Sequence, residues 1–431
     1  MKKIFYLLCM VVAVMATSCS NEQEDFFSDS SANRANAKVK STIEVLSSAS
    51  NGWLMQYFPG DPETWGGYNM IIKFGADGKV TVANEVSYPD YTETSYYSVK
   101  QSAGVMLSFD TYNNLFHVFS DPSAPLSGDL GEGMQGDYDF SVMSADADKV
   151  VLKGRKQGTY AILTPMPEGQ TWEEYLTNVK TVKDKMLSLK YTLDVDGKQL
   201  VGQPYRRTLR FYTTDEEGNT KTIIMPYVFC EDGIKTYGTV NIEGAEISGF
   251  NFSDNGTYSE RGGSDVKLTQ VVQPLNQLLV NYQWFCDYEN MGTYGQKAWR
   301  YFKNGLDQIG DFLIYAFVGT YNERFGFHFY SLASDGNRYG GGLNMSISFI
   351  GDNQVTMQFN QSGYGSGAWY HDNAKMDFAM YPFGYAKAKT FTITTDNPLM
   401  PSYLILTDNS DKDNVIKLSY SVVYYPFLSL E

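Results

Sequence analysis

Residues 66–81, GGYNMIIKFGADGKVT, recur almost intact as residues 341–356, GGLNMSISFIGDNQVT. At this constant offset of 275 residues, nine of the sixteen positions are identical and the alignment needs no gap. Self-similarity at a fixed offset is typical of a duplicated supersecondary unit. The first copy places Asp77-Gly78 between two apolar runs, which is a specific signal of a tight hairpin turn. The repeat therefore predicts a β-hairpin that occurs twice. It constrains the fold without indicating any chemistry.

Short segments rich in aromatic and β-branched residues, separated by Gly, Asp, Asn or Pro, fill most of the chain. Such segments are typical of strands. Eight are expected within residues 53–163, a smaller group within residues 187–259, and about eight within residues 312–420, including one at Lys375–Met380. Many strands with short links favour an up-and-down barrel or a sandwich. We therefore predict an all-β protein with a few short helices, in which two similar antiparallel barrel or sandwich units surround a smaller β middle region.

This pattern divides the chain into five expected segments. They are a lipoprotein signal peptide (1–18), an acidic tether and short helix (19–50), a first β unit with a closing helix (51–186), a middle β region with helices (187–310) and a second β unit (311–431). The first unit combines a barrel, a following helix and Gly52-Trp53 at its first strand. In these respects it is similar to the lipocalin plan.

The N-terminus carries a targeting signal. Lys2 and Lys3 precede the apolar run Ile4–Met15, which is too short for a spanning helix of ~20 residues. Small residues then precede Cys19, an arrangement that resembles the lipobox of bacterial lipoproteins, where the cysteine is acylated after cleavage. The alternative is an ordinary signal peptide with an incidental cysteine. The acidic residues that follow, within 20–25, resemble the surface-export tether of Bacteroidetes lipoproteins, although a random acidic linker would look similar. We predict a protein anchored to the outer membrane by lipid and exposed at the cell surface.

The charge balance narrows the range of partners. The chain has 34 basic and 49 acidic residues and a net charge of −15. Nucleic acid is a poor partner because phosphate binding needs a basic patch. An anionic membrane surface would also repel this protein, so membrane attachment is expected to come from the lipid alone.

Cys230 and Cys286 remain once the signal and the lipidated cysteine are set aside. In an oxidising compartment they could form one disulfide. The alternative is two buried thiols, because the sequence does not show whether their Cα atoms come within ~7 Å.

Three motifs link the chain to a known family: Asn51-Gly52-Trp53, Gly66-Gly67-Tyr68-Asn69 and the block LSFDTYN at residues 107–113. Together with the lipobox, they resemble a family of Bacteroidetes lipoproteins defined by a domain of unknown function. Members of this kind often accompany starch-utilisation-type importers. The resemblance implies an accessory role in capturing or importing a polymeric nutrient, with importer components as partners, and it supplies no catalytic residues.

Signals for metal binding or catalysis are weak. The three histidines, His117, His328 and His371, lie far apart and have no metal-ligand spacing. Residues 408–414, DNSDKDN, have the oxygen density of a calcium loop but lack its glycine and glutamate, so a solvated hairpin turn is favoured. No GxSxG elbow or phosphate-binding loop is present. We predict no metal, no cofactor and no catalytic residue. A carboxylate pair for glycoside hydrolysis remains an alternative, since its geometry is three-dimensional.

Aromatic residues give the best indication of binding. The 33 tyrosines exceed what a core of this size can satisfy, because each buried hydroxyl needs a partner. Tyr364, Trp369 and Tyr370 lie in a Gly-rich segment that we expect to be a flexible loop, and Trp65 and Tyr68 flank Gly66-Gly67. Their rings could stack on sugars or on apolar peptide side chains. The alternative is that they pack on their own barrels.

The leading interpretation is a surface lipoprotein that acts as a non-catalytic binding or accessory component of nutrient uptake, with a glycan or peptide ligand. The alternatives are a secreted hydrolase with carboxylate catalysis and a structural or adhesive surface protein.

Overall fold

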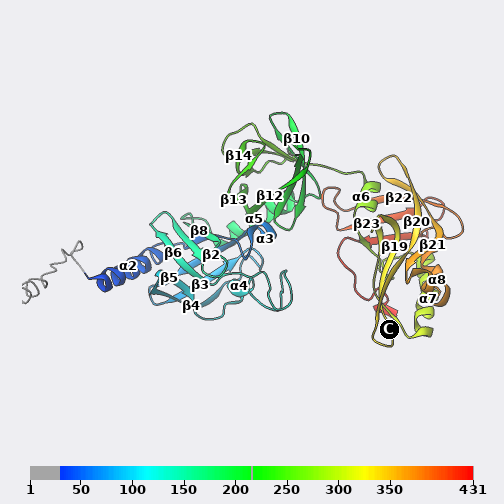
Figure 1. The fold of residues 1–431 in the computed structure, drawn as a ribbon, viewed down its shortest axis with the longest axis horizontal. Helices are drawn as coiled ribbons and strands as arrows, with labels where there is room; N and C mark the ends of the chain where they lie inside the picture. The colour runs from blue at the N-terminus through cyan, green and yellow to red at the C-terminus, as the bar shows by residue number, and fades with distance from the viewer. Residues whose placement is uncertain (1–29, 215–216, 431) are drawn as a thin grey trace, which may run out of the picture. The chain divides into compact units, whose positions relative to one another are not determined.

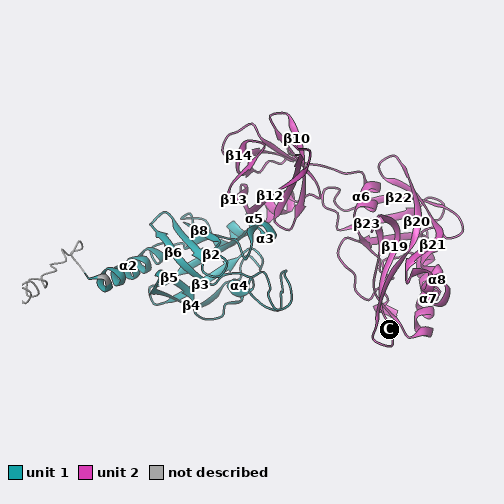
Figure 2. Ribbon diagram, in the orientation of Figure 1, with its two compact units in different colours: residues 1–178 teal, residues 179–431 magenta. Residues whose placement is uncertain are grey.

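The computed structural model describes residues 30–214 and 217–430 of the 431-residue chain (Figure 1). The predicted signal peptide, Cys19 and most of the acidic tether lie outside the described residues. In the described ranges, no helix is both long and apolar enough to cross a membrane. Contacts within the chain define two compact units, residues 1–178 and 179–431 (Figure 2).

Twenty-four strands in the described residues form three closed barrels of eight strands each. Each barrel closes by antiparallel pairing: β1 with β8, β9 with β16, and β17 with β24. This confirms the predicted all-β class with barrel units. The middle region is itself a closed barrel, although its strands showed no repeat in the sequence.

The first barrel is preceded by a helix and carries two short helices between its strands. Its elements are α2 (Ser31–Leu46), β1 (Trp53–Tyr57), α3 (Pro62–Trp65), β2 (Tyr68–Phe74), β3 (Lys79–Asn84), β4 (Glu93–Ser102), β5 (Gly104–Phe109), α4 (Asn114–His117), β6 (Asp139–Ala145), β7 (Val150–Gly154) and β8 (Tyr160–Pro165). Helix α5 (Trp172–Met186) follows.

The second barrel contains no helix among its strands. They are β9 (Tyr191–Val195), β10 (Lys198–Tyr205), β11 (Thr208–Thr214), β12 (Thr220–Cys230), β13 (Gly233–Ile242), β14 (Ala245–Asn251), β15 (Thr257–Glu260) and β16 (Lys267–Gln270).

The third barrel has longer helical insertions. Its elements are α6 (Leu275–Asn281), β17 (Trp284–Phe285), α7 (Thr293–Ile309), β18 (Phe312–Tyr321), β19 (Arg324–Leu332), β20 (Arg338–Ile350), β21 (Gln354–Gly365), α8 (Gly367–Asn373), α9 (Asp377–Met380), β22 (Lys389–Thr395), β23 (Tyr403–Asp408) and β24 (Val415–Ser419). The short helix η1 (Leu428–Leu430) follows β24. Strand β17 therefore lies before Asp311, where the sequence predicts the last unit to begin.

The first and third barrels share one order of elements after their leading helices: strand, helix, four strands, one or two helices, three strands. They also share an anchor at the first strand. Trp53 and Trp284 are both fully buried. The Nε1–H group of Trp53 donates to the carbonyl of Leu46, and that of Trp284 donates to the carbonyl of Leu278, each over 2.8 Å. In both barrels the indole thus ties the leading helix to the strand that opens the sheet.

The sequence repeat forms a β-hairpin in both barrels, as predicted. The register is the same, because Phe74 pairs with Val80 and Phe349 pairs with Val355. The hairpins nevertheless occupy different places, since β2–β3 are the second and third strands of the first barrel and β20–β21 are the fourth and fifth strands of the third. The repeated residues do not mark equivalent positions in the two barrels.

One local prediction for the third barrel is wrong, and one short strand was not predicted. The strand expected at Lys375–Met380 is replaced by helix α9. Strand β17 was missed because it consists of two residues only, too few to show an alternating pattern.

Candidate functional site

The five aromatic residues predicted to bind a ligand have different surroundings. Trp65 is only 9% exposed and belongs to the core cluster of the first barrel, and the partly buried Tyr68 packs against that cluster. Tyr364 lies near the end of β21 and is partly buried. Trp369 and Tyr370 are neighbours on α8, where Trp369 is 52% exposed and Tyr370 is 1% exposed. The structure therefore brings Trp369 and Tyr370 together and leaves Trp65 and Tyr68 in another barrel.

The segment that carries these residues in the third barrel is not the flexible loop expected from its glycines. It forms the end of β21 and helix α8. Gly367 begins the helix directly against β20, where a Cβ atom at this position would lie 2.2 Å from the carbonyl oxygen of Gly342. Only glycine allows this approach. The glycines thus bring a helix and its aromatic side chains onto the sheet.

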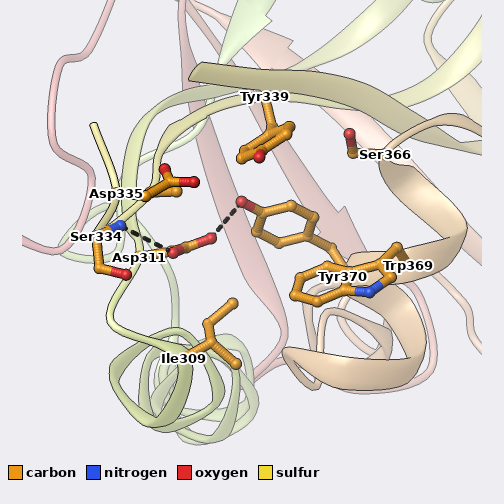
Figure 3. A pocket seen from close by; sticks show the side chains of 9 residues that line it. Ile309, Asp311, Ser334, Asp335, Tyr339, Ser366, Trp369 and Tyr370 are labelled. Atoms are coloured by element: carbon orange, nitrogen blue, oxygen red, sulfur yellow. Dashed lines mark hydrogen bonds between the residues drawn. The ribbon is translucent and has the colours of Figure 1, made fainter. Parts of the chain in front are cut away.

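Trp369 and Tyr370 line a cavity of about 380 Å³ in the third barrel (Figure 3). The other lining residues are Ile309, Asp311, Ala333, Ser334, Asp335, Tyr339 and Ser366. They come from the end of α7, the β19–β20 turn, the start of β20 and α8. Helix α7 stops at Gly310, whose φ of 76° is left-handed. This stop directs Asp311 to the cavity.

Asp311 is the buried polar anchor of the cavity. The residue is 7% exposed, and its carboxylate accepts hydrogen bonds from the Tyr370 hydroxyl over 2.5 Å and from the Ser334 N–H over 3.3 Å. Figure 3 shows the Tyr370 hydroxyl pointing toward it. The hydroxyl of Ser331 lies 2.7 Å from that of Tyr370; since the Tyr370 proton goes to Asp311, Ser331 is the donor. Burial, together with the Asp311 carboxylate, raises the pKa of Tyr370 well above its usual range. Tyr370 therefore stays a proton donor.

Asp335 provides a second carboxylate, and it is exposed. The backbone N–H and the side-chain amide of Asn337 each donate to it over 2.8 Å. These hydrogen bonds lower the pKa of Asp335 below its usual range, so it is ionised at neutral pH. The cavity thus offers an exposed indole face beside two carboxylates, an arrangement that can accept hydrogen bonds from hydroxyl or amine groups of a bound molecule.

Sequence reasoning missed Asp311 and Asp335, which lie far from Trp369 along the chain. Two local signals precede them: Gly310 after a helical pattern, and Asp335-Gly336 in a turn. Neither signal shows that the two segments meet at α8.

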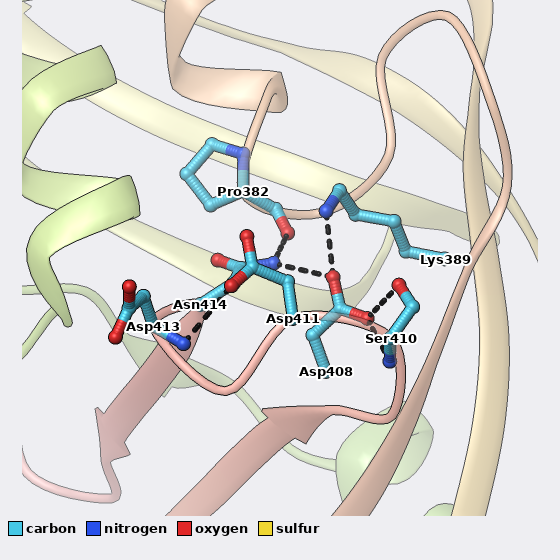
Figure 4. Close-up of polar contacts among 7 residues, drawn as sticks. All are labelled: Pro382, Lys389, Asp408, Ser410, Asp411, Asp413 and Asn414. Atoms are coloured by element: carbon cyan, nitrogen blue, oxygen red, sulfur yellow. Dashed lines mark hydrogen bonds and ion pairs between the residues drawn. The ribbon is translucent and has the colours of Figure 1, made fainter.

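The segment 408–414 is a hairpin loop between β23 and β24, as favoured, but its first carboxylate is not solvated (Figure 4). Asp408 is fully buried and accepts hydrogen bonds from Lys389 Nζ over 2.6 Å, Asn414 Nδ2 over 3.0 Å and the Ser410 N–H over 2.9 Å. Burial opposes its ionisation, but these donors outweigh burial and lower its pKa to about 2. Lysine thus neutralises the carboxylate here.

Across the described part of the chain, no cluster of three or more His, Cys, Asp or Glu side chains could hold a metal ion.

Cys230 and Cys286 are buried thiols, and no disulfide joins them. Cys230 ends β12 in the second barrel, and Cys286 directly follows β17 in the third. Burial raises the pKa of Cys286 far above its usual range. The structure therefore agrees with the alternative of two buried thiols and not with a disulfide between them.

A family model described as a domain of unknown function, DUF4302, matches residues 23–254, more than half of the chain. The cavity beside Trp369 lies outside this match. No curated protein sequence matches the chain significantly. Among solved structures, similarity is found to the DNA polymerase III beta subunits of Pseudomonas aeruginosa (8% identity, TM-score 0.13) and Thermotoga maritima (10% identity, TM-score 0.14). Each alignment covers 90% of this chain and 98% of the other. At such TM-scores these similarities carry no argument about fold or function.

Proposed function

We propose, from the premise that this chain belongs to the DUF4302 family of unknown function, that it is a binding protein that holds a glycan or peptide in the Trp369 cavity of its third barrel. The observation that carries the proposal is the pairing of an exposed indole, 52% accessible, with a cavity of about 380 Å³. Ligand sites are typically concave, with aromatic walls and a few placed polar groups.

The chemistry of the cavity supports a ligand with a flat face and several hydrogen-bond donors. An indole offers a large apolar face at low cost in side-chain entropy. The fixed carboxylate of Asp311 and the ionised carboxylate of Asp335 supply acceptors beside it. Both sugar rings and amine-bearing side chains fit this description, so the ligand class proposed is a glycan or a peptide.

The cellular setting is proposed from the sequence alone. In this proposal, Cys19 carries the lipid, the outer membrane holds the protein at the cell surface, and importer components receive the captured nutrient. A Cys19→Ser variant is expected to leave the membrane fraction for the soluble fraction. Its retention in the membrane fraction would refute the lipid anchor.

The binding proposal is tested with Trp369→Ala. We expect a ligand from a panel of glycans and peptides to bind the unmodified protein and to lose at least tenfold in affinity in this variant, as for aromatic residues that dominate an interface. Tyr301→Ala is the matched control, because Tyr301 is 47% exposed in the same barrel and is not a lining residue. Equal binding by Trp369→Ala and the control would exclude the cavity as the site.

One observation favours hydrolysis as a second candidate: Asp311 and Asp335 line the same cavity. A hydrolase of this type needs one carboxylic acid with a raised pKa, whereas the pKa of Asp335 is lowered. Cleavage of an oligosaccharide that is lost in both Asp311→Asn and Asp335→Asn would establish hydrolysis in place of binding.

A further inference from the structure

Aromatic side chains form two rows across the outer face of the third barrel. Opposite residues of an antiparallel ladder lie on the same face of the sheet. One row runs through Phe285, Phe317, His328, Gly342 and Tyr364, and the next through Tyr315, Tyr330 and Gly340. The intervening residues Ala316 and Phe329 belong to the core of the barrel. The two rows therefore lie on the face of the sheet opposite the core, where Phe285, Phe317 and His328 are nearly buried and Tyr315, Tyr330 and Tyr364 are partly exposed.

Glycines of β20 let these rings lie close against the strand, and a groove runs beside them. A Cβ atom at Gly342 would lie 2.7 Å from Cε1 of Tyr364 and 2.8 Å from Nδ1 of His328, so no side chain fits there. Gly340 is solvent-exposed in the next row. The groove has a volume of about 520 Å³, and the exposed rings of Tyr321 and Tyr424 also line it.

The residues that line the groove carry no charge, and the Arg324 guanidinium lies 4.9 Å from the ring centre of the lining residue Tyr364. None of the thirteen residues that line the groove is Asp, Glu, Lys or Arg. His328 is 2% exposed, and its Nε2 lies 3.0 Å from the carbonyl oxygen of Gly319, so Nε2 carries a proton. Its Nδ1 then accepts from the Tyr364 hydroxyl over 2.7 Å. Burial lowers the pKa of His328 below its usual range, which keeps the ring neutral at neutral pH.

We propose that this groove binds a neutral oligosaccharide. Sugar rings combine flat C–H faces with hydroxyl groups, and tyrosine offers both a stacking face and a hydroxyl partner. The protein's net charge of −15 disfavours a polyanion, and a cationic peptide finds no carboxylate among the lining residues. The partly exposed rings run from Tyr315 on β18 to Tyr364 on β21, which is three strand spacings or on the order of 14 Å at ~4.8 Å each, so they extend past the length of one sugar ring.

This inference goes beyond the function proposed above, because the groove and the Trp369 cavity have no lining residue in common. Either site can fail a test without the other. The groove is therefore tested in a Trp369→Ala background, in which remaining binding reports on the groove.

The experiment is isothermal titration calorimetry with neutral gluco-, manno- and xylo-hexasaccharides. We expect one of them to bind the Trp369→Ala protein, and the further change Tyr321→Ala/Tyr424→Ala to weaken that binding at least tenfold. These two tyrosines are 44% and 61% exposed, so folding should be preserved, which circular dichroism checks. Tyr301→Ala in the same background is the control and should leave binding unchanged. Binding should also be insensitive to salt, because the ligand is uncharged.

Three results would overturn the proposal. The first is that no neutral hexasaccharide binds in the Trp369→Ala background. The second is that binding survives the loss of Tyr321 and Tyr424. The third is that apolar peptides compete for the groove while the hexasaccharides do not.

Discussion

The first and third barrels differ in what lies between equivalent strands. After the first strand, the first barrel has the four-residue helix α3, whereas the third has the 17-residue helix α7. After the fifth strand, the four-residue helix α4 corresponds to α8 and α9. In the first barrel, α4 packs into the interior, with Phe116 stacked on Phe109 at 3.8 Å between ring centres. In the third, α7 and α8 carry residues that line the cavity. The two barrels thus share the order of their strands and the buried tryptophan at the first strand, whereas the helices inserted in the third barrel carry residues of the candidate site.

The largest expected effect tests this shared arrangement. Trp53→Ala and Trp284→Ala should each destabilise the barrel that carries the change by about 3–5 kcal/mol, because a fully buried indole leaves a cavity and the helix carbonyl loses its donor. Urea unfolding followed by near-ultraviolet circular dichroism measures this. Trp369→Ala is the exposed control and should change stability by no more than about 0.5 kcal/mol. A large loss in only one of the two barrels would break the proposed equivalence.

The next largest expected effect comes from a difference in how the two barrels stabilise a buried carboxylate. Asp137 in the first barrel accepts from the backbone N–H groups of Lys156 and Gln157, over 2.7 and 3.0 Å. Asp408 in the third accepts from the side chain of Lys389. Lys389→Met should therefore cost about 3 kcal/mol, because it leaves a buried charge unpaired. The matched change Lys156→Met keeps its backbone donor and should have little effect in the same urea unfolding experiment. Equal effects of the two changes would contradict this distinction.

Asp408 also predicts a pH dependence for the third barrel. Its folded pKa of about 2 lies below the ordinary value of 3.8, so its ionised form stabilises the fold above about pH 4. That contribution should be lost as the pH falls from 4 toward 2. Asp408→Asn should flatten the stability profile across this window, and an unchanged profile would show that another group is responsible.

The smallest expected effect compares two buried tyrosine hydroxyls. Tyr57 in the first barrel donates to the carbonyl of Asp137 over 2.9 Å, while Tyr370 in the third donates to the carboxylate of Asp311. Hydrogen bonds to charged groups contribute more than neutral ones. Tyr370→Phe should therefore cost about 2 kcal/mol and Tyr57→Phe about 1 kcal/mol, measured by urea unfolding. The reverse order would show that the carboxylate finds another donor.

The sequence predicts the elements better than their assembly. Alternation within a strand is a local property, so the hairpins at residues 66–81 and 341–356 could be recognised. Their places in the barrels depend on distant pairing, such as Phe285 with Ser419, which no local pattern contains. The repeated residues 66–81 and 341–356 therefore do not occupy equivalent places in the two barrels. The equivalent residues are Trp53 and Trp284, which lie outside the repeat. Trp369 and Tyr370 could be selected as ring-bearing residues next to glycines. Asp311 and Asp335 could not, because the pairing of β18–β21 and the packing of α8 against β20 bring them together.

Closure of all three sheets has a consequence for recognition. In an open sheet, the outermost strand presents unpaired N–H and C=O groups, and an extended peptide can add to it as a further strand. Each strand in the described part of this chain has a neighbour on both sides. Where a strand is paired on both sides, a partner therefore finds no edge to extend. The pairing is incomplete in the second barrel, where only Tyr227–Cys230 of β12 pair with β13 and only Phe250 and Asn251 of β14 pair with β15. Over the paired strands, specificity therefore comes from side chains and loop backbone, and exposed rings such as Trp369 are the groups that contact a partner.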